Sequence, residues 1–507
     1  SAKISEKNPL NDEFNTLLWV KRSGCDLRTM KMDGFVVLYQ DKIEELKSVY
    51  RGLEFESEMV GLLQYCFQKA GFQAPSIETF THAYIPYKHV DHLHSDSIIS
   101  IATSANGKTI TREIYGDEIG WIPWQRPGFD FALNLEEFIL TNPNMKGVIW
   151  QHHGLITWGQ NSKDCYFNSV NTITKAAIYI NNRAKSNAFG KLIFTFSPSE
   201  KRKNIACKIM PRLRYYLSKQ NRKMGQFFDS EDILEFVNAE NASEFCDLGT
   251  SCPDHFLRTK IKPLYFKTDL DQLIADETLS RLEKEIDDYA KSYSDYYKKN
   301  KEFDSPNLRD PFPVIILIPG LGLFAFGKNK RETRISAEFY INAIHVMKGA
   351  ICIDNYTVLS EKEAFDVEYW LLEEDKLKRL PKEKEMARKI ALIVNQNNPG
   401  IVHKMLSEDA CITDIESSSS LIEEFKTEYF LGLYKTKTNK TEFEKAMVEC
   451  TLNFGGIDVF VLDKTVFYTE SKLSDIAHKI IKKLKYQGLG GSIILINPDF
   501  IPKAKLD

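Results

Sequence analysis

Two stretches of this chain decide its fold: His89-Val-Asp-His-Leu-His-Ser-Asp96 and Gly147-Val-Ile-Trp-Gln-His-His-Gly-Leu-Ile-Thr-Trp-Gly159. The second is rich in Val, Ile and Trp, and β-branched and aromatic side chains are enriched in strands. We therefore predict strands over Val90–Ala102 and Gly147–Trp158. Six of the ten histidines lie in or near these stretches: His82, His89, His92, His94, His152 and His153.

The histidines of the two predicted strands are spaced so that they can share one metal ion. On a strand, residues i and i+2 point to the same face, so His92 and His94 can reach a single ion. Neighbours on a strand face opposite ways, so only one of His152 and His153 should join them, and Gly154 lets the backbone approach closely. Three imidazoles with an open fourth position are typical of a catalytic zinc site.

A carboxylate beside the imidazoles would complete the metal shell or act as a base. Glu78 in Pro75-Ser-Ile-Glu78 is the leading candidate, and Asp91 and Asp96 are alternatives. The competing explanation is that the histidines bind nothing, because an isolated His-x-His pair is weak evidence for a metal. The second strand and the flanking carboxylate strengthen the metal hypothesis. His82 and His89 are expected to be surface residues or to lie behind the ligands.

Size and composition are those of a soluble globular protein, and 507 residues predict two or three domains. Hydrophobic residues make up 43%, charged residues 27%, and the net charge is −3, which gives no argument for a nucleic-acid or membrane partner. The nine cysteines are scattered and form no CxxC pair, which is typical of reduced thiols in a cytoplasmic protein. No apolar run reaches the ~18–20 residues that a membrane span needs, and no secretory pattern opens the sequence.

The rest of the chain is expected to fold into further helices and strands. A charged helix is predicted over Glu277–Lys299, and an apolar strand with a Gly-rich turn over Val314–Gly327. A linker dense in Lys and Glu spans Glu374–Glu385. Strands then alternate with helices, which predicts a parallel α/β sheet. The predicted strands are Ile390–Val394, Ala410–Ile415, Ile457–Leu462 and Ser492–Ile496, and the predicted helices are Leu421–Leu431, Lys440–Leu452 and Leu473–Lys485.

Longer motifs surround the histidines and continue beyond them. Besides the two stretches quoted above, they are Ala74-Pro-Ser-Ile-Glu-Thr-Phe-Thr-His-Ala83, Thr111-Arg-Glu-Ile-Tyr-Gly-Asp-Glu-Ile-Gly-Trp-Ile-Pro-Trp-Gln-Arg-Pro-Gly128, Ser251-Cys-Pro-Asp-His-Phe-Leu-Arg-Thr-Lys260 and Leu317-Ile-Pro-Gly-Leu-Gly-Leu-Phe-Ala-Phe-Gly-Lys328. Together they resemble the class II aldolase/adducin family, and within it the long bifunctional rhamnulose-1-phosphate aldolase/alcohol dehydrogenase proteins. The resemblance covers nearly the whole chain.

The resemblance implies a metal-dependent aldolase. Such enzymes cleave a ketose 1-phosphate to dihydroxyacetone phosphate and an aldehyde, with a zinc ion stabilising the enediolate and a carboxylate moving the proton. By motif, His92, His94 and His153 match the metal ligands and Glu78 matches the catalytic carboxylate. The resemblance also implies a homo-oligomer that acts on a small phosphorylated sugar.

A phosphate pocket is implied near the end of an early strand. The family uses a small hydroxyl residue and a Gly there, so Ser23 and Gly24 are expected to bind the phosphate together with Ser76. The close family commonly reads Lys-Gly-Ser-Gly where this chain has Lys21-Arg-Ser-Gly24, so Arg22 either adds charge to the pocket or closes it. A Gly-rich segment that usually comes before the present first residues either lies upstream or is missing, in which case substrate binding is weak.

The C-terminal part resembles a short-chain dehydrogenase that is truncated and has lost its nucleotide motifs. Asn395-Gln-Asn-Asn-Pro-Gly400 stands where the glycine fingerprint is expected, and Leu462-Asp-Lys-Thr-Val466 replaces an Asn-Asn-Ala-Gly segment. Asp414 is either a ribose contact or a solvated loop residue. Tyr468 and Lys472 have the spacing of the catalytic pair but precede the strand they should follow, so we expect them at the surface. NAD is therefore not expected as a cofactor.

The expected fold is α/β throughout. Residues 1–200 should form a class II aldolase-like α/β/α domain, 201–373 a helical extension that completes the aldolase region, 374–385 a linker, and 386–507 a truncated Rossmann-like domain with a parallel sheet. The function this predicts is an active zinc aldolase with an inactive dehydrogenase half. The alternative is a non-catalytic scaffold, as in adducin.

Overall fold

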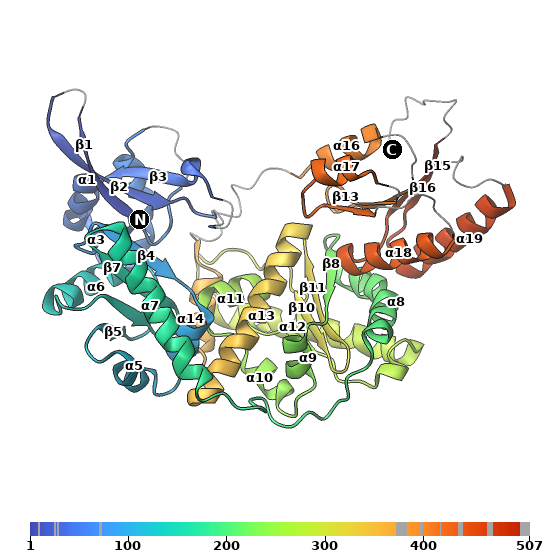
Figure 1. Cartoon of the computed structure of the whole chain (residues 1–507), viewed down its shortest axis with the longest axis horizontal. Helices are drawn as coiled ribbons and strands as arrows, with labels where there is room; N and C mark the ends of the chain where they lie inside the picture. The colour runs from blue at the N-terminus through green and yellow to red at the C-terminus, as the bar shows by residue number, and fades with distance from the viewer. Residues whose placement is uncertain are drawn as a thin grey trace.

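Three sheets organise the chain, one in each of three regions that follow one another in sequence (Figure 1). This computed structural model describes residues 1–8, 11–24, 27, 30–69, 74–371, 383–394, 399–415, 417–433, 440–463 and 470–496. We name the parts that hold the sheets the N-terminal region (1–181), the middle region (199–371) and the C-terminal region (383–496). The domain boundaries expected from the sequence stay predictions, and residues 374–382 of the expected linker lie outside the described residues.

The N-terminal region is built on a seven-stranded sheet with the order β3-β2-β1-β4-β7-β6-β5. Neighbouring strands are antiparallel except for β5 and β6, which are parallel. The strands are β1 (Ala2–Lys7), β2 (Phe14–Lys21), β3 (Phe35–Tyr39), β4 (His89–Leu93), β5 (Ile119–Ile122), β6 (Gly147–Trp150) and β7 (Gly154–Gly159). The helices are α1 (Gln40–Glu45), α2 (Glu56–Leu62), α3 (Thr79–Tyr84), α4 (Asp96–Ala102), α5 (Gly107–Tyr115), α6 (Phe129–Thr141) and α7 (Ser162–Asn181).

Helices cover both faces of this sheet. Val148 and Trp150 of β6 point to the face that α6 covers. Ile149 between them points to the other face, where α4, α5 and α7 pack. Alternate residues of one strand are therefore buried on opposite sides, which explains why the strand reads as a continuous apolar run. The arrangement confirms the α/β/α layering expected for this part of the chain.

The strand predicted over Val90–Ala102 is wrong in its second half. The strand β4 ends at Leu93, and residues 96–102 form the helix α4. Short apolar runs do not distinguish a strand from a buried helix by pattern alone. The residues that decide here are Ser95 and Asp96, because Ser95 accepts the first backbone hydrogen bonds of the helix and Asp96 places a negative charge in its first turn.

The strand predicted over Gly147–Trp158 is a hairpin of two strands. Trp150 of β6 pairs with Gly154 of β7, so residues 151–153 form the connecting turn. The turn requires a left-handed conformation, which His152 adopts with φ of 56°. The two histidines therefore lie at the tip of the hairpin and not within a strand, and of the two it is His153 that lies with His92 and His94.

The middle region carries a four-stranded sheet as well as helices. Its order is β8-β11-β10-β9, with α8 and α12 packed on one face and α9 and α13 on the other. The charged helix and the Gly-rich turn predicted here are α12 and the turn between β10 and β11. The strands are β8 (Met224–Phe228), β9 (Leu264–Tyr265), β10 (Ile315–Ile318) and β11 (Gly322–Gly327). The helices are α8 (Ser199–Leu217), α9 (Glu231–Val237), α10 (Ala242–Leu248), α11 (Pro253–Thr259), α12 (Asp276–Asn300), α13 (Lys330–Ile353) and α14 (Glu361–Glu368).

The C-terminal region is a five-stranded parallel sheet, as predicted, with the order β14-β13-β12-β15-β16. Helices α18 and α19 pack on one face and α16 and α17 on the other. This strand order is that of a doubly wound nucleotide-binding fold. The elements are β12 (Ile390–Val394), α16 (Pro399–Ser407), β13 (Cys411–Ile415), α17 (Ser419–Glu424), β14 (Phe430–Leu433), α18 (Lys440–Phe454), β15 (Val459–Asp463), α19 (Glu470–Gln487) and β16 (Ser492–Ile496).

Two sequence expectations in this sheet need correction. The helix predicted over Leu421–Leu431 is the short helix α17 followed by the strand β14. Asp414 is no solvated loop residue: it is buried in β13 and accepts a hydrogen bond from the Ser417 hydroxyl at 2.5 Å. Residues 395–398, 464–466 and Tyr468, and the side chain of Lys472, which carry the predictions about nucleotide motifs, lie outside the described residues.

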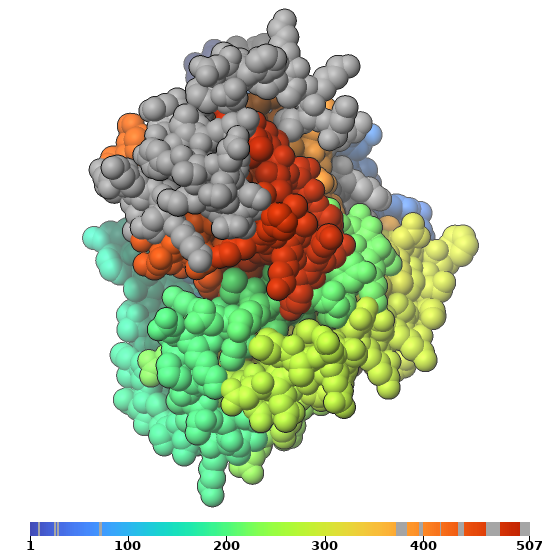
Figure 2. Space-filling model, turned by 90° about the vertical axis from the view of Figure 1, so that its right-hand side faces the viewer, coloured from blue at the N-terminus to red at the C-terminus, as the bar shows by residue number. Residues whose placement is uncertain are grey.

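A buried ion pair joins the middle and C-terminal regions. Arg214 on α8 donates two hydrogen bonds to the two carboxylate oxygens of Asp458, at 2.9 and 2.7 Å, and the side chains are 1% and 2% exposed. Arg222 adds a third contact to the same carboxylate at 3.0 Å. Figure 2 shows the red surface of the C-terminal region resting on the green surface of the middle region.

Within the part of the chain that the structure describes, no helix combines the length and apolar character needed to cross a bilayer.

Candidate metal centre

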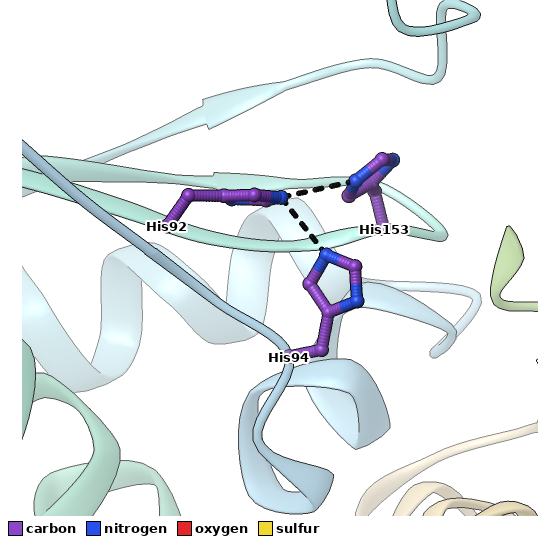
Figure 3. Close-up of side chains that lie close together, drawn as sticks. All are labelled: His92, His94 and His153. Carbon is purple, nitrogen blue, oxygen red and sulfur yellow. Dashed lines mark hydrogen bonds between the residues drawn. The ribbon is translucent and has the colours of Figure 1, made fainter. Parts of the chain in front are cut away.

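Three imidazole rings from the two histidine stretches converge on one point (Figure 3). The Nε2 atom of His92 lies 2.9 Å from Nε2 of His94 and 3.2 Å from Nε2 of His153. His92 lies on β4, His94 directly follows that strand, and His153 ends the turn of the β6–β7 hairpin. Because β4 and β7 are neighbouring strands, the sheet itself brings the two stretches together.

Hydrogen bonds on the far side of two rings aim their Nε2 atoms at this point. The Nδ1–H of His92 donates to the backbone oxygen of Leu155 at 3.0 Å, and the Nδ1–H of His94 donates to Oδ2 of Asp254 at 2.6 Å. A carbonyl or carboxylate oxygen can only accept, so each contact fixes which ring nitrogen carries the proton. At His92 the lone pair of Nε2 is then available to a metal. At His94 the Asp254 carboxylate, against the effect of burial, also holds the pKa of the ring well above its usual value, so a bound ion would replace the proton on Nε2.

His153 is held by stacking instead. Its ring lies parallel to the indole of Trp150, with centroids 3.8 Å apart, and Phe131 stacks on the opposite face of that indole at 3.6 Å. Burial lowers the pKa of His153 to about 4, so the ring is neutral at physiological pH. A neutral imidazole is the form that binds metal ions.

Glu78 lies against the same ring nitrogens. Its two carboxylate oxygens are 3.3 Å from Nε2 of His92 and 3.1 Å from Nε2 of His153, and the side chain is 14% exposed. Burial by itself would raise the pKa of this carboxyl, but the imidazoles of His92 and His153 hold the pKa well below its ordinary value. Glu78 is therefore ionised at neutral pH and can accept a proton.

The residues expected to bind phosphate lie together, next to Glu78. The backbone N–H of Ser23 donates to the oxygen of Ala74, and that of Ser76 donates to the oxygen of Lys21, each at 3.0 Å. The hydroxyl of Ser76 accepts from the N–H of Glu78 at 3.3 Å. The Ser23 hydroxyl is buried and has no hydrogen-bond partner among the described residues, and Gly24 follows with φ of 77°.

The other sequence candidates lie outside the group of three histidines. Asp91 accepts from a serine hydroxyl of α7 at 3.2 Å, and Asp96 pairs with a histidine of α13 at 3.1 Å. His82 is buried and bonds the Ser1 hydroxyl, so it is not a surface residue, whereas His89 is partly exposed. His152 is buried, and burial lowers its pKa to about 4.

The donor set fits a divalent transition metal. In a tetrahedral zinc site with Zn–N bonds of about 2.0–2.1 Å, the ligand nitrogens are roughly 3.3 Å apart. The separations of 2.9 and 3.2 Å between Nε2 atoms agree with that spacing. Three imidazoles and one carboxylate also suit zinc and its neighbours better than calcium or magnesium, which prefer oxygen ligands.

Asp254 is the residue at this centre that reasoning from sequence missed. It lies on α11 of the middle region, 160 residues beyond His94. It stands in the motif Ser251-Cys-Pro-Asp-His255, which contributed to the family resemblance without a role being assigned.

Comparison with known proteins identifies the family of the chain. Residues 1–180 match the description "Class II Aldolase and Adducin N-terminal domain", and residues 204–377 match "Aldolase class II, second domain". The chain belongs to the class II aldolase/adducin family. A curated relative, "Uncharacterized oxidoreductase YuxG" of Bacillus subtilis (strain 168), is 33% identical over 526 residues, which cover 98% of this chain and 76% of the relative.

Solved structures similar to this chain cover about a third of it. The N-terminal class II aldolase domain of a conserved protein from Thermoplasma acidophilum is 28% identical, covers 36% of this chain and 82% of its own, and has a TM-score of 0.33. An L-fuculose 1-phosphate aldolase is 16% identical, covers 36% of this chain and 76% of its own, and has a TM-score of 0.24.

Proposed function

We propose that this chain is a metal-dependent aldolase that cleaves a ketose 1-phosphate, such as rhamnulose 1-phosphate, to dihydroxyacetone phosphate and an aldehyde. The observation that carries the proposal is the convergence of three imidazole Nε2 atoms with the carboxylate of Glu78. A scaffold without catalysis has no need for three clustered imidazoles, two of which have the outer nitrogen fixed by a hydrogen bond.

The residues divide the chemistry between them. His92, His94 and His153 would hold zinc or another divalent ion, which when bound supplies Lewis-acid stabilisation of negative charge on the substrate oxygens. Glu78 is ionised and stands beside the ligand nitrogens, so in the condensation direction its carboxylate removes the proton from the three-carbon substrate. In the cleavage direction the same carboxyl returns that proton to the carbon that has lost the aldehyde.

We further propose that the turn after β2 binds the substrate phosphate. The buried Ser23 hydroxyl supplies a donor, and Ser76 lies beside it through the backbone pairing of the two segments. Gly24 lets the backbone turn so that N–H groups can face an anion. The hydrogen bond from the N–H of Glu78 to the Ser76 hydroxyl supports this proposal, because it joins the segment that would bind the phosphate to the residue that would move the proton.

A dehydrogenase function is the second candidate, because the C-terminal strand order is that of a nucleotide-binding fold and the relative in Bacillus subtilis is named an oxidoreductase. We propose that this half does not transfer hydride, since the sequence has Asn395-Gln-Asn-Asn-Pro-Gly400 in place of a glycine fingerprint. A rise in melting temperature on adding NAD or NADH would favour the dehydrogenase instead. From the family resemblance we also propose a homo-oligomer, and from the scattered cysteines a cytoplasmic location.

The decisive experiment combines metal analysis with an assay for released dihydroxyacetone phosphate. We expect wild-type protein to hold a stoichiometric divalent ion and to release the product from one or more ketose 1-phosphates. His92→Ala should lose the ion and the activity together, because the substitution removes the central ligand. His89→Ala is the matched control on the same strand and should keep both.

Two results would contradict the proposal. Full metal content in His92→Ala would show that the ligands are misassigned. A metal-loaded wild-type protein that cleaves no ketose 1-phosphate would favour the scaffold alternative.

A further inference from the structure

The three metal-ligand candidates differ in what orients them. His92 is oriented by Leu155 of the adjacent strand, and His153 by the aromatic stack within its own region. His94 lies beyond the end of β4, so no strand pairing fixes it. Its ring is oriented by the hydrogen bond that it donates to Asp254, in a different region of the chain.

The segment that carries Asp254 is firmly placed. The buried thiol of Cys252 donates to the backbone oxygen of His153 at 3.6 Å, which ties the start of α11 to the tip of the hairpin. The Tyr356 hydroxyl donates to the oxygen of Gly249 at 3.1 Å and lies 3.2 Å from the Ser251 hydroxyl. The rest of α11 packs against α13. Asp254 is thus held where it is by both regions.

We propose that Asp254 is a positioning residue of the metal centre, through which the middle region controls how tightly the N-terminal region binds its metal. The inference rests on the proposed metal-dependent function. A carboxylate on the outer nitrogen of a ligating imidazole fixes the ring and raises its basicity, and the loss of such a partner typically weakens metal binding by about 10–100-fold. The carboxylate does not touch the metal, because Nδ1 and Nε2 lie on opposite sides of the ring.

The coupling runs in both directions. If docking of the middle region improves metal binding, then bound metal stabilises that docking by the same factor. The two parts matched by the aldolase family descriptions would then form one binding unit, with the ligands supplied by the first and the orientation of His94 by the second.

The test measures metal dissociation constants by chelator competition on the full chain. We expect Asp254→Ala to weaken zinc binding by about 10–100-fold. Asp254→Asn keeps an acceptor oxygen without the charge, so it should fall between the alanine variant and wild type, and it remains informative if Asp254→Ala does not fold. The matched control is Asp232→Ala. It also removes a carboxylate that pairs with a histidine, at 3.1 Å, but that histidine is His345, which is not a candidate metal ligand. The control should bind zinc as wild type does.

A double-variant cycle separates positioning from general destabilisation. In a His94→Ala background, Asp254→Ala should cause no further loss of zinc affinity, because the ring that it orients is gone. A further loss of the same size as in wild type would overturn the proposal, and so would an unchanged dissociation constant in Asp254→Ala or an equal loss in Asp232→Ala.

Wild-type protein that binds zinc without cleaving any ketose 1-phosphate would overturn the aldolase function and leave the role of Asp254 standing. Wild-type protein that binds no zinc would overturn both.

Discussion

Gly154 of the β6–β7 hairpin lies close to the ring of His94. A Cβ atom built on Gly154 would lie 2.7 Å from Cδ2 of the His94 ring and 2.7 Å from the backbone oxygen of Leu93. Both distances are too short for a real contact, so a side chain here must displace the ring and also the Leu93 oxygen, which belongs to a paired strand. The position therefore admits only glycine because a side chain has no space there, and not because of the backbone conformation.

We expect Gly154→Ala to weaken metal binding at least tenfold and to lower the free energy of unfolding by about 1–3 kcal/mol, as overpacking does. Metal titration and denaturant unfolding measure the two effects. Gly61→Ala is the control, since a Cβ there meets nothing within 4 Å and the residue lies in a helix. Wild-type metal affinity in Gly154→Ala would show that the ring of His94 has room to shift.

At the scale of single residues, much of the candidate site could be predicted from the local sequence. The i, i+2 spacing of His92 and His94 and the clustering of their partners predicted a shared ion, and the structure brings their nitrogens together. Asp254 was not predictable in the same way. Its contact with His94 joins residues 160 apart, and no spacing rule reaches over such a distance.

At the scale of secondary structure, the predictions failed where two elements follow one another across a short polar segment. Between Val90 and Ala102 the polar residues from His94 to Ser97 end the strand, and the helix α4 starts there. The hairpin tip was missed because His152 adopts a left-handed conformation that glycine or asparagine would have signalled. The charged helix predicted over Glu277–Lys299 was close to its true ends, since α12 spans Asp276–Asn300.

His345 on α13 connects three helices in a way that depends on pH. Its ring nitrogens lie 3.1 Å from Asp96 at the start of α4 and 3.1 Å from Asp232 at the start of α9. The hydrogen bond to Asp96, together with the bond to Asp232 and against the effect of burial, raises the pKa of His345 above its usual 6.5. A raised pKa in the folded state means that the protonated ring stabilises the fold.

We expect this stabilisation to be complete below about pH 6.5 and to fade as the pH rises through the raised pKa. His345→Asn should therefore destabilise metal-free protein more at pH 6 than at pH 9, by about 1 kcal/mol or less because the ring is partly exposed. Urea unfolding at the two pH values measures the difference. An equal effect of His345→Asn at both pH values would contradict the expectation.

At the scale of the whole molecule, the ion pair between Arg214 and Asp458 should dominate the joint between the middle and C-terminal regions. Removing one partner of a buried pair leaves an uncompensated charge, which costs about 3–5 kcal/mol. We expect Asp458→Asn to lower the free energy of unfolding by that amount, measured from the first denaturant transition of the full chain. Asp271→Asn breaks an exposed pair with Lys201 and should cost less than about 1 kcal/mol. A loss no larger than in this control would show that the joint depends on apolar packing.

The sequence predicted the architecture of the separate regions better than their assembly. Alternating apolar strands and helices after residue 385 predicted the parallel sheet, although the strand β14 was mistaken for part of a helix. Neither the contact of α11 with the hairpin nor the packing of α8 against the C-terminal region was predictable. Both depend on side chains that lie far apart in the sequence.

The buried arginine gives the C-terminal sheet a reason to persist that has nothing to do with redox chemistry. Deleting the sheet would expose Met224, which packs into the core of the C-terminal region, and would leave the buried Arg214 without its counter-charge. Natural selection acting on the stability of the middle region would then preserve the C-terminal sheet whatever chemistry that sheet performs. The C-terminal region would then be kept because it covers buried residues of the middle region.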